Sequence, residues 1–461
     1  MEPTIITIET PSLGDRSYLA HDGEVALVVD PQRDIDRVLA AADEAGVRIT
    51  DVFETHIHND YVTGGLALAR RLGARYHVNA EDEVSFGREP IRDGDVVEVS
   101  PVMRVRAIAT PGHTFTHLSY AVESVTDSGA TDSAVFTGGS LLFGAAGRPD
   151  LLGREHTGDL VRHQFASIHR LVDELSESAE VLPTHGFGSF CSAGSTGGAT
   201  ESTIAEEKRR NPALTQTEEQ WVADTLAGLD AYPAYYVHMS PANAAGPDAA
   251  DLSAPERADK DTLAQRIDAG EWVVDLRTRT AFAAGHVAGT LSFGLDGQFS
   301  TYLGWLIPWE ARVTLLGETS EQVAEAQREM ARIGLDRIGL DRIAGAATGA
   351  PQDWTDRPLE TLETAAFADL SQVRHHRPVH VLDVRLAGEY ADGHVEGAQN
   401  VPIGELLDRF DEIPQRELWV HCGSGYRASI AASLLSARGH RVVLVDDAFD
   451  NAGAAGLPIT D

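Results

Sequence analysis

The fold of the C-terminal part of this chain is decided by Trp419-Val420-His421-Cys422-Gly423-Ser424-Gly425-Tyr426-Arg427-Ala428-Ser429. A short apolar run ends at Cys422, two glycines let the chain turn, and a helix-prone stretch begins at Ala428. A strand that passes through a short loop into a helix is typical of an α/β domain with a parallel sheet.

Cys422 is expected to lie among the backbone N–H groups of this loop, at the positive end of the following helix. Such surroundings favour the thiolate over the thiol, and the thiolate is the nucleophile. The alternative is a buried structural cysteine, which is common for this residue type. The loop glycines and Arg427 favour a reactive site. We therefore predict Cys422 and Arg427 as catalytic residues.

The composition of the 461-residue chain limits its setting and its partners. At ~150 residues per domain, the length predicts roughly three domains. The formal net charge of −34 and the small number of lysines argue against nucleic-acid binding, because no basic patch is available. The sequence has neither a long apolar run nor a signal-peptide pattern, so we expect no membrane span. The two cysteines exclude a disulfide scaffold and suit the cytoplasm, which is the expected location.

Two α/β units in the second half of the chain repeat one pattern. The first contains Val274-Asp275-Leu276-Arg277 and Phe282-Ala283-Ala284-Gly285-His286-Val287-Ala288-Gly289. The second contains Leu382-Asp383-Val384-Arg385 and Tyr390-Ala391-Asp392-Gly393-His394-Val395-Glu396-Gly397, at one constant spacing from the first. This is an internal duplication, and each unit is expected to form a parallel sheet covered on both faces. The first unit has no cysteine, so we expect it to serve packing or docking.

A set of residues in the second unit carries a family resemblance. The set is Asp383, Arg385, Gly393-His394-Val395, Gly397-Ala398, Asn400-Val401-Pro402 and the loop from Cys422 to Arg427. The pair of units resembles the rhodanese sulfurtransferases. The resemblance implies that Cys422 becomes a persulfide and that the loop N–H groups with Arg427 hold an anionic substrate. It thus assigns substrate binding to Gly423, Ser424, Gly425 and Tyr426.

Four histidines in the first half of the chain follow apolar runs and stand beside glycine, proline or other loop residues. Two lie in Thr55-His56-Ile57-His58-Asn59-Asp60-Tyr61, the third in Thr110-Pro111-Gly112-His113-Thr114, and the fourth in Leu182-Pro183-Thr184-His185-Gly186. Histidine and aspartate side chains on loops that leave neighbouring strands can point at one centre. The pattern therefore predicts a metal site.

This pattern resembles the metallo-β-lactamase fold, a four-layer αββα sandwich, and in particular the persulfide dioxygenases fused to rhodanese domains. Gly144-Ala145-Ala146-Gly147-Arg148-Pro149-Asp150-Leu151 and His185-Gly186-Phe187-Gly188-Ser189-Phe190-Cys191 also resemble segments of those fusions. We thus expect an α/β multidomain chain, with an αββα sandwich followed by two rhodanese-like domains with parallel sheets. The expected domains are residues 1–245, residues 256–348 without the cysteine, and residues 355–461 with Cys422. Residues 243–255 are expected to be a linker.

Gly139 departs from the pattern of this family. The family has an aspartate at that position, which forms a two-histidine, one-carboxylate iron site with the histidines that match His56 and His113. Such a site leaves positions open for dioxygen and substrate. Gly139 has no side chain to donate, and Tyr61 stands where many members of the fold have another histidine. We therefore expect no two-metal centre.

Three outcomes stay open for the metal. His58 completes a three-histidine site with His56 and His113, a water or a group such as Asp60 fills the gap, or the domain has lost its metal and is a scaffold. We predict His56, His58 and His113 as ligands of one metal ion, iron(II) rather than zinc. Cys191 is either a small buried hydrophobe or a thiol at the mouth of the metal site that contacts a persulfide. It is included among the predicted substrate-binding residues.

Together these features predict an enzyme of sulfide and persulfide metabolism. Cys422 would transfer sulfur, and the metal domain would bind a thiol persulfide or oxidise it to sulfite with dioxygen. The expected partners are a low-molecular-weight thiol persulfide, thiosulfate or sulfite, and a further copy of the chain, as in fused relatives. The alternatives are a sulfurtransferase with a metal-depleted scaffold, a zinc thioester hydrolase of the glyoxalase II type, and a sulfur-sensing protein without enzymatic activity.

Overall fold

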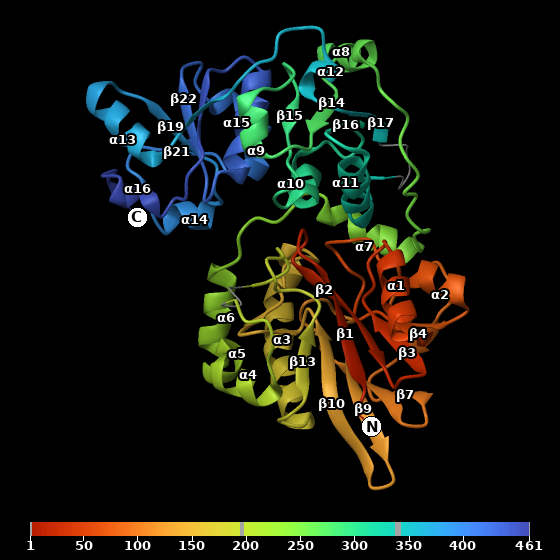
Figure 1. The fold of residues 1–461 in the computed structure, drawn as a ribbon. Helices are drawn as coiled ribbons and strands as arrows, with labels where there is room; N and C mark the ends of the chain where they lie inside the picture. Colours follow the sequence, from red (N-terminus) through yellow and green to blue (C-terminus); the bar gives the residue numbers. More distant parts are fainter. Residues whose placement is uncertain (1, 194–197, 337–342, 461) are drawn as a thin grey trace. The chain divides into compact units, whose positions relative to one another are not determined.

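The computed structural model of the protein describes residues 2–193, 198–336 and 343–460. It divides into two units, and Figure 1 traces the chain through them. Unit 1 comprises Met1–Ala250 and Ala331–Gly334, and unit 2 comprises Asp251–Met330 and Leu335–Asp461. Apart from Ala331–Gly334, the two stretches predicted as separate domains, residues 256–348 and 355–461, lie in unit 2, and their division into two domains stays a prediction. Across the described residues, no helix combines the length and the apolar character needed to cross a membrane.

Unit 1 is built on two β-sheets. The first has the strand order β1-β2-β3-β4-β5-β6, and the second has the order β13-β10-β9-β8-β7. The strands of the first sheet are β1 (Thr4–Thr10), β2 (Asp15–His21), β3 (Val25–Val29), β4 (Arg48–Phe53), β5 (Arg75–Asn79) and β6 (Glu89–Ile91). Those of the second are β7 (Val96–Ser100), β8 (Met103–Ala109), β9 (Leu118–Thr126), β10 (Gly129–Gly138) and β13 (Glu180–Pro183). A small hairpin, β11 (Leu141–Leu142) with β12 (Ala145–Ala146), follows β10.

The two sheets of unit 1 enclose an apolar core. Alternate residues of β8, namely Met103, Val105 and Ala107, pack in this core with Phe53 of the first sheet. Their spacing of two follows from the alternation of side chains along a strand. Ile108 of the same strand belongs instead to the core on the outer face of the second sheet. The sheets are therefore each covered on both faces.

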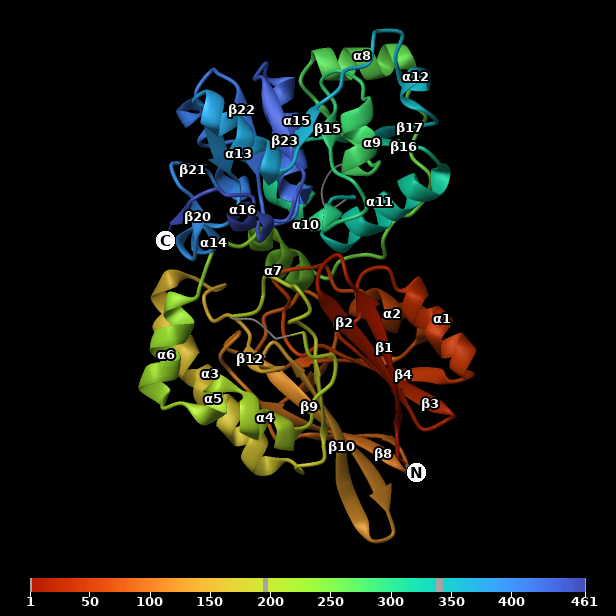
Figure 2. The ribbon, with the colours of Figure 1, turned by 60° about the vertical axis from the view of Figure 1, so that its left-hand side comes forward.

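Helices cover the outer faces of the two sheets, as Figure 2 shows. On the first sheet, Val38 and Ala42, one helical turn apart, pack with Val52. On the second sheet, Ile168 packs in one core with Val135. The helices are α1 (Asp36–Ala45), α2 (Gly65–Leu72), α3 (Arg154–Glu174), α4 (Ile204–Arg210), α5 (Pro212–Thr215) and α6 (Glu218–Ala227). A further helix, α7 (Tyr236–Ala245), contributes no residue to these two cores. This arrangement confirms the predicted αββα sandwich.

Unit 2 contains two parallel sheets, as the sequence predicts. Their strand orders are β15-β14-β16-β17 and β18-β23-β22-β19-β21. The strands of the first are β14 (Trp272–Asp275), β15 (Leu291–Ser292), β16 (Val313–Gly317) and β17 (Ile343–Thr348). Those of the second are β18 (Glu363–Ala365), β19 (His380–Asp383), β21 (Gln399–Asn400), β22 (Leu418–His421) and β23 (Val442–Val445). A separate pair is formed by β20 (His394–Val395) and β24 (Ile459–Thr460).

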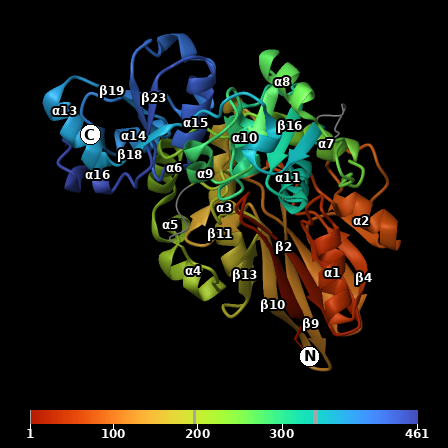
Figure 3. The same cartoon turned by 45° about the horizontal axis from the view of Figure 1, so that its top comes forward.

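The helices of unit 2 follow the strands in both halves, and Figure 3 shows them around the two sheets. In the first half they are α8 (Lys260–Asp268), α9 (Arg279–Ala284), α10 (Phe299–Leu306), α11 (Ser320–Arg332) and α12 (Pro351–Trp354). In the second half they are α13 (Phe367–His376), α14 (Ala387–Ala391), α15 (Tyr426–Ala437) and α16 (Asn451–Ala454), with 3₁₀ turns η1 (Ile403–Glu405) and η2 (Phe410–Glu412). The longest helix of the second half, α15, begins directly at the Cys422 loop.

The repeated motifs of the two halves form the same hydrogen bonds. In each half an arginine donates to the aspartate two residues before it and to the carbonyl of the glycine eight residues after it. These triads are Asp275, Arg277 and Gly285 in the first half, and Asp383, Arg385 and Gly393 in the second. The triads tie the end of a strand to the end of the next helix. The duplicated motif is therefore structural, and the chemistry of the second half lies elsewhere.

The predicted linker begins too early. Residues 243–245 still belong to α7, and the side chain of Asn243 is buried. Asn243 donates to the carbonyls of His58 and Tyr61, at 2.9 and 2.8 Å, and accepts the N–H of Thr63 at 2.9 Å. The prediction failed because the small residues of this stretch are typical of a linker. The Asn243 side chain among them nevertheless binds the backbone of the histidine loop.

Candidate functional site

The four histidines predicted as a metal pattern gather at one end of the unit 1 sandwich. His56 and His58 follow β4, His113 follows β8, and His185 follows β13. All four are buried. One nitrogen each of His56, His113 and His185 lies within 4.8 Å of the other two. The loops that leave three strands thus bring three imidazoles to one point.

The tautomer of His56 is fixed by its neighbours. The Thr55 hydroxyl donates to Asp30 at 2.7 Å and lies 2.9 Å from Nδ1 of His56. Burial alone would raise the pKa of Asp30, but the neighbouring His58 holds that pKa below its usual range, so Asp30 is an acceptor. Because the only hydroxyl proton goes to Asp30, His56 donates from Nδ1 to Thr55. Its Nε2 is left with a lone pair.

The other two imidazoles are held in the same way. Nδ1 of His113 donates to the carbonyl of Arg148 at 2.8 Å, since a carbonyl can only accept. Nδ1 of His185 donates to Asp15 at 2.9 Å and lies 3.2 Å from Asp60. Such acceptors behind each ring are the usual way in which proteins orient metal-binding histidines.

The three Nε2 atoms lack hydrogen-bond partners among the described residues, although all are buried. Burial lowers the pKa of His56 well below its usual range and that of His113 to about 3, so both rings are neutral. Burial also opposes charge on His185, but Asp60 and Asp15 raise its pKa well above the usual range. A metal ion would replace that proton. Unpaired buried nitrogens are costly unless filled, so this set fits a divalent metal that accepts imidazole ligands.

His58, the third ligand in the sequence prediction, is placed differently. Its Nε2 lies 3.2 Å from Asp30, 3.3 Å from Glu54 and 3.0 Å from the Tyr61 hydroxyl. Its Nδ1 has no partner among the described residues, and His58 forms a second group with Asp60 and His185. Its role as a ligand stays a prediction. His185, rather than His58, converges with His56 and His113. The sequence feature that indicated His185 was its position directly after a strand.

Gly139 packs against the ring of His113. A Cβ atom at Gly139 would lie 2.3 Å from Cδ2 of His113, closer than real contacts allow. The Gly139 N–H donates to Nε2 of His117 at 3.0 Å, and Nδ1 of His117 lies 2.8 Å from the Thr110 hydroxyl. His117 is not among the residues predicted from the sequence, although its spacing of four from His113 offered a signal. No room exists here, with His113 in this position, for the aspartate that the family resemblance implies.

Gly139→Ala tests this close packing. We expect the added methyl group to displace His113, lower the free energy of unfolding by about 1–3 kcal/mol, and reduce metal binding. Urea unfolding and metal analysis measure the two effects. Gly158→Ala is the control, because a Cβ at this helical, exposed glycine meets no atom within 4 Å. Equal stability of the two variants would contradict the described packing.

Cys191 lies beside the histidine cluster and is buried. Its Sγ is 3.9 Å from the Tyr236 hydroxyl. Burial raises the pKa of this thiol well above its usual range, and the Asp60 and Asp15 carboxylates raise it further. Cys191 is therefore a thiol rather than a thiolate, and the predicted contact with a persulfide stays a prediction.

Cys422 lies at the carboxyl end of β22, in the predicted loop. β22 pairs with β19 on one side and β23 on the other. The chain continues from β19 to β21 on one side and from β22 to β23 on the other, so the direction of winding reverses between β19 and β22. Ligands usually bind at such a switch point of a parallel sheet. The Gly425 N–H donates to Sγ of Cys422 at 3.1 Å. Gly425 has φ of +95°, a conformation that favours glycine.

The other residues of the loop have different surroundings. Ser424 is exposed and Gly423 is half-buried. Arg427 donates to both carboxylate oxygens of Glu389, one of them at 2.8 Å. Tyr426 is turned toward the first half: its hydroxyl donates to the carbonyl of Gly294 at 2.7 Å. The Tyr426 ring is thus already bonded elsewhere. Substrate binding by Tyr426 stays a prediction, and it concerns the backbone N–H.

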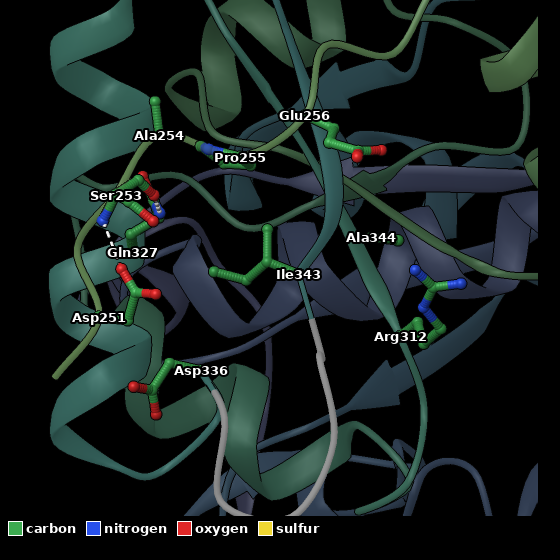
Figure 4. A pocket seen from close by; sticks show the side chains of 10 residues that line it. All are labelled: Asp251, Ser253, Ala254, Pro255, Glu256, Arg312, Gln327, Asp336, Ile343 and Ala344. Atoms are coloured by element: carbon green, nitrogen blue, oxygen red, sulfur yellow. Dashed lines mark hydrogen bonds between the residues drawn. The ribbon is translucent and has the colours of Figure 1, made fainter. Parts of the chain in front are cut away.

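A separate pocket lies in the half without the cysteine. It has a volume of about 270 Å³ and is shown in Figure 4. Its lining residues are Asp251, Ser253, Ala254, Pro255, Glu256, Arg312, Gln327, Asp336, Ile343 and Ala344. Arg312 precedes β16 and Ile343 begins β17, so the pocket lies where these strands start. Ligands of α/β sheets usually bind at the opposite, carboxyl edge, and no predicted site residue lines this pocket.

Comparison with known families agrees with this geometry. Residues 15–151 match the Metallo-beta-lactamase superfamily, and residues 367–454 match the Rhodanese-like domain. The chain joins a metallo-β-lactamase domain to a rhodanese-like domain. The predicted recognition and fold are thereby confirmed. The metallo-β-lactamase domain contains the histidine cluster, and the rhodanese-like domain contains Cys422.

Relatives of the metallo-β-lactamase domain include two kinds of enzyme. Persulfide dioxygenase ETHE1 of Homo sapiens is 27% identical over 222 residues, 48% of this chain and 76% of that protein. A hydroxyacylglutathione hydrolase of Rhodopseudomonas palustris is 33% identical over 144 residues, 30% of this chain and 52% of that protein. The chain spans about half the length of the hydrolases that it matches. The domain is thus related to persulfide dioxygenases and to hydrolases.

A solved structure extends the likeness beyond one domain. The crystal structure of a metallo-beta-lactamase from Staphylococcus aureus has a TM-score of 0.66 and 25% sequence identity. The match covers 76% of this chain and 100% of that one. It therefore includes residues outside the metallo-β-lactamase domain.

Proposed function

We propose that the chain is a sulfurtransferase that works through a Cys422 persulfide, joined to a metal domain that binds or oxidises a thiol persulfide. The observation that carries the proposal is the Gly425 N–H bonded to Sγ of Cys422 at a switch point of a parallel sheet. A backbone donor at this place stabilises a thiolate, and then a persulfide anion. The relation to both a rhodanese-like domain and persulfide dioxygenases supports it.

Sulfur transfer at Cys422 requires two displacements. The Cys422 thiolate attacks the outer sulfur of a donor, forming a new S–S bond as the bond between that sulfur and the donor breaks. The donor leaves as a thiolate, or as sulfite when the donor is thiosulfate. An acceptor then attacks the outer sulfur of the Cys422 persulfide and releases the thiolate. With sulfite as the acceptor, the product is thiosulfate.

In the metal domain, His56, His113 and His185 would hold one ion, with iron(II) expected rather than zinc from the relation to persulfide dioxygenases. The ion would supply open positions where a persulfide and dioxygen meet. Thr55, Arg148 and Asp15 keep the three ring nitrogens directed to that point. The overall reaction would convert a thiol persulfide, dioxygen and water into a thiol, sulfite and two protons.

Measurement of metal and turnover on the isolated full chain tests both halves of the proposal. We expect about one iron per chain, oxygen uptake with a glutathione or coenzyme A persulfide, and sulfur transfer from thiosulfate to cyanide. Sulfur transfer without iron or oxygen uptake would leave only the sulfurtransferase. Two zinc ions per chain and thioester hydrolysis would instead support a hydrolase, as the hydroxyacylglutathione relatives suggest.

A further inference from the structure

The cysteine-free half of unit 2 packs directly on the Cys422 loop and its helix. The Ser292 N–H of β15 donates to the Ser433 hydroxyl of α15 at 3.0 Å, and the Ser292 and Ser429 hydroxyls lie 2.8 Å apart. A Cβ at Gly297 would lie 2.4 Å from the ring of Tyr426, so that ring rests on the backbone of the first half. These contacts fix the start of α15, and with it the loop.

Asp446 places a negative charge against the same loop. It follows β23, next to β22, and a Cβ built on Gly425 would lie 2.1 Å from its Oδ1. Gly425 supplies the N–H that donates to Sγ of Cys422. The Asp446 carboxylate beside Gly425 therefore disfavours the negatively charged thiolate of Cys422, because like charges repel.

Arg279 of the cysteine-free half neutralises this carboxylate. Its Nε lies 2.7 Å from Asp446 Oδ1, and one of its terminal nitrogens lies 3.5 Å from Asp296. The Arg279–Asp446 pair is half-buried, with side chains 29% and 17% exposed. The Asp446 hydrogen bond raises the pKa of Arg279, and the charge of Cys422 contributes in the same direction. A Cβ built on Gly425 would lie 3.0 Å from Nε of Arg279, so Arg279 lies beside the residue whose N–H donates to Sγ of Cys422.

We propose that Arg279 is a positioning residue of the sulfur-transfer site, because it neutralises Asp446 beside Gly425. The half without a cysteine thereby supplies a positive charge to the half that contains Cys422. The proposal rests on the proposed sulfur transfer. The charged and titratable groups around the loop include Arg427, Glu389, Arg279, Asp446, Asp296, Tyr302, Tyr426 and His421. The other arginine of the site, Arg427, pairs with Glu389.

A double-mutant cycle on the full chain tests this role. Arg279→Gln is expected to slow sulfur transfer from thiosulfate to cyanide about tenfold and to raise the pH of half-maximal Cys422 alkylation by about one unit, since one unit corresponds to a tenfold change in thiolate fraction. Asp446→Asn alone is expected to move the alkylation profile toward lower pH. Arg279→Gln with Asp446→Asn is expected to return both readouts to within about threefold of the original chain.

The outcomes separate this inference from the proposed function. A double variant as slow as Arg279→Gln would mean that Arg279 only holds the two halves together, which overturns the proposal. The proposal is also overturned if Arg279→Gln keeps the transfer rate and the alkylation profile of the original chain. If Arg279→Gln does not fold, the Asp446→Asn profile decides, because a shift toward higher pH is incompatible with a repulsive carboxylate. Absence of transfer in the original chain refutes the proposed function, while the alkylation profiles still test Arg279. Arg416→Gln, at an exposed arginine of the same unit, is the control.

Discussion

Cys422→Ser is expected to lower sulfur transfer from thiosulfate to cyanide by about 10³-fold or more, because a serine oxygen cannot carry a persulfide. The Gly425 N–H would still find an acceptor in the serine, so the fold of the loop should be kept. Cyanolysis kinetics measure the loss. Circular dichroism and the iron content of the variant should match those of the original chain.

Cys191→Ser is the control for this loss, because Cys191 lies in unit 1 beside the histidine cluster. Transfer from thiosulfate to cyanide should continue at its original rate in that variant. The assignment of Cys422 fails if Cys422→Ser keeps its activity, or if the loss belongs to Cys191→Ser instead.

His113→Ala is expected to remove most of the metal from unit 1, with iron per chain falling at least about tenfold. The reason is that His113 supplies one of the three converging nitrogens, and Arg148 already holds its other nitrogen. Oxygen uptake with a persulfide should disappear with the metal, whereas transfer through Cys422 should remain. Elemental analysis, oxygen consumption and cyanolysis separate these effects.

His163→Ala provides the comparison, since His163 is an exposed histidine on α3. It should keep the metal content of the original chain. Full iron occupancy in His113→Ala would exclude His56, His113 and His185 as the metal ligands. It would instead favour the group of His58, Asp60 and His185.

The sequence predicted those features that depend on local pattern. The Cys422 loop, its strand and its helix were recognised because an apolar run, two glycines and a helix-prone stretch are consecutive. The repeated aspartate–arginine motif predicted the duplication, although its role in tying strand to helix needed coordinates. The metal pattern was recognised from histidines at strand ends, and the αββα fold followed from its resemblance to a family.

Features that depend on distant residues could not be predicted in this way. The direction of each imidazole is decided by Asp30, Asp15 and the Arg148 carbonyl, which lie far from the histidines along the chain. The contact between Arg279 and Asp446 joins residues on different halves of unit 2. Spacing in a sequence carries no information about such pairs. The same limit explains why Asn243 was assigned to a linker.

Because the ring of His113 occupies the space above Gly139, a carboxylate placed at that position would first have to displace the ring. An aspartate there would disturb one of the converging imidazoles before it could act as a ligand. A change of metal preference in this protein is therefore expected to need substitutions at positions other than 139.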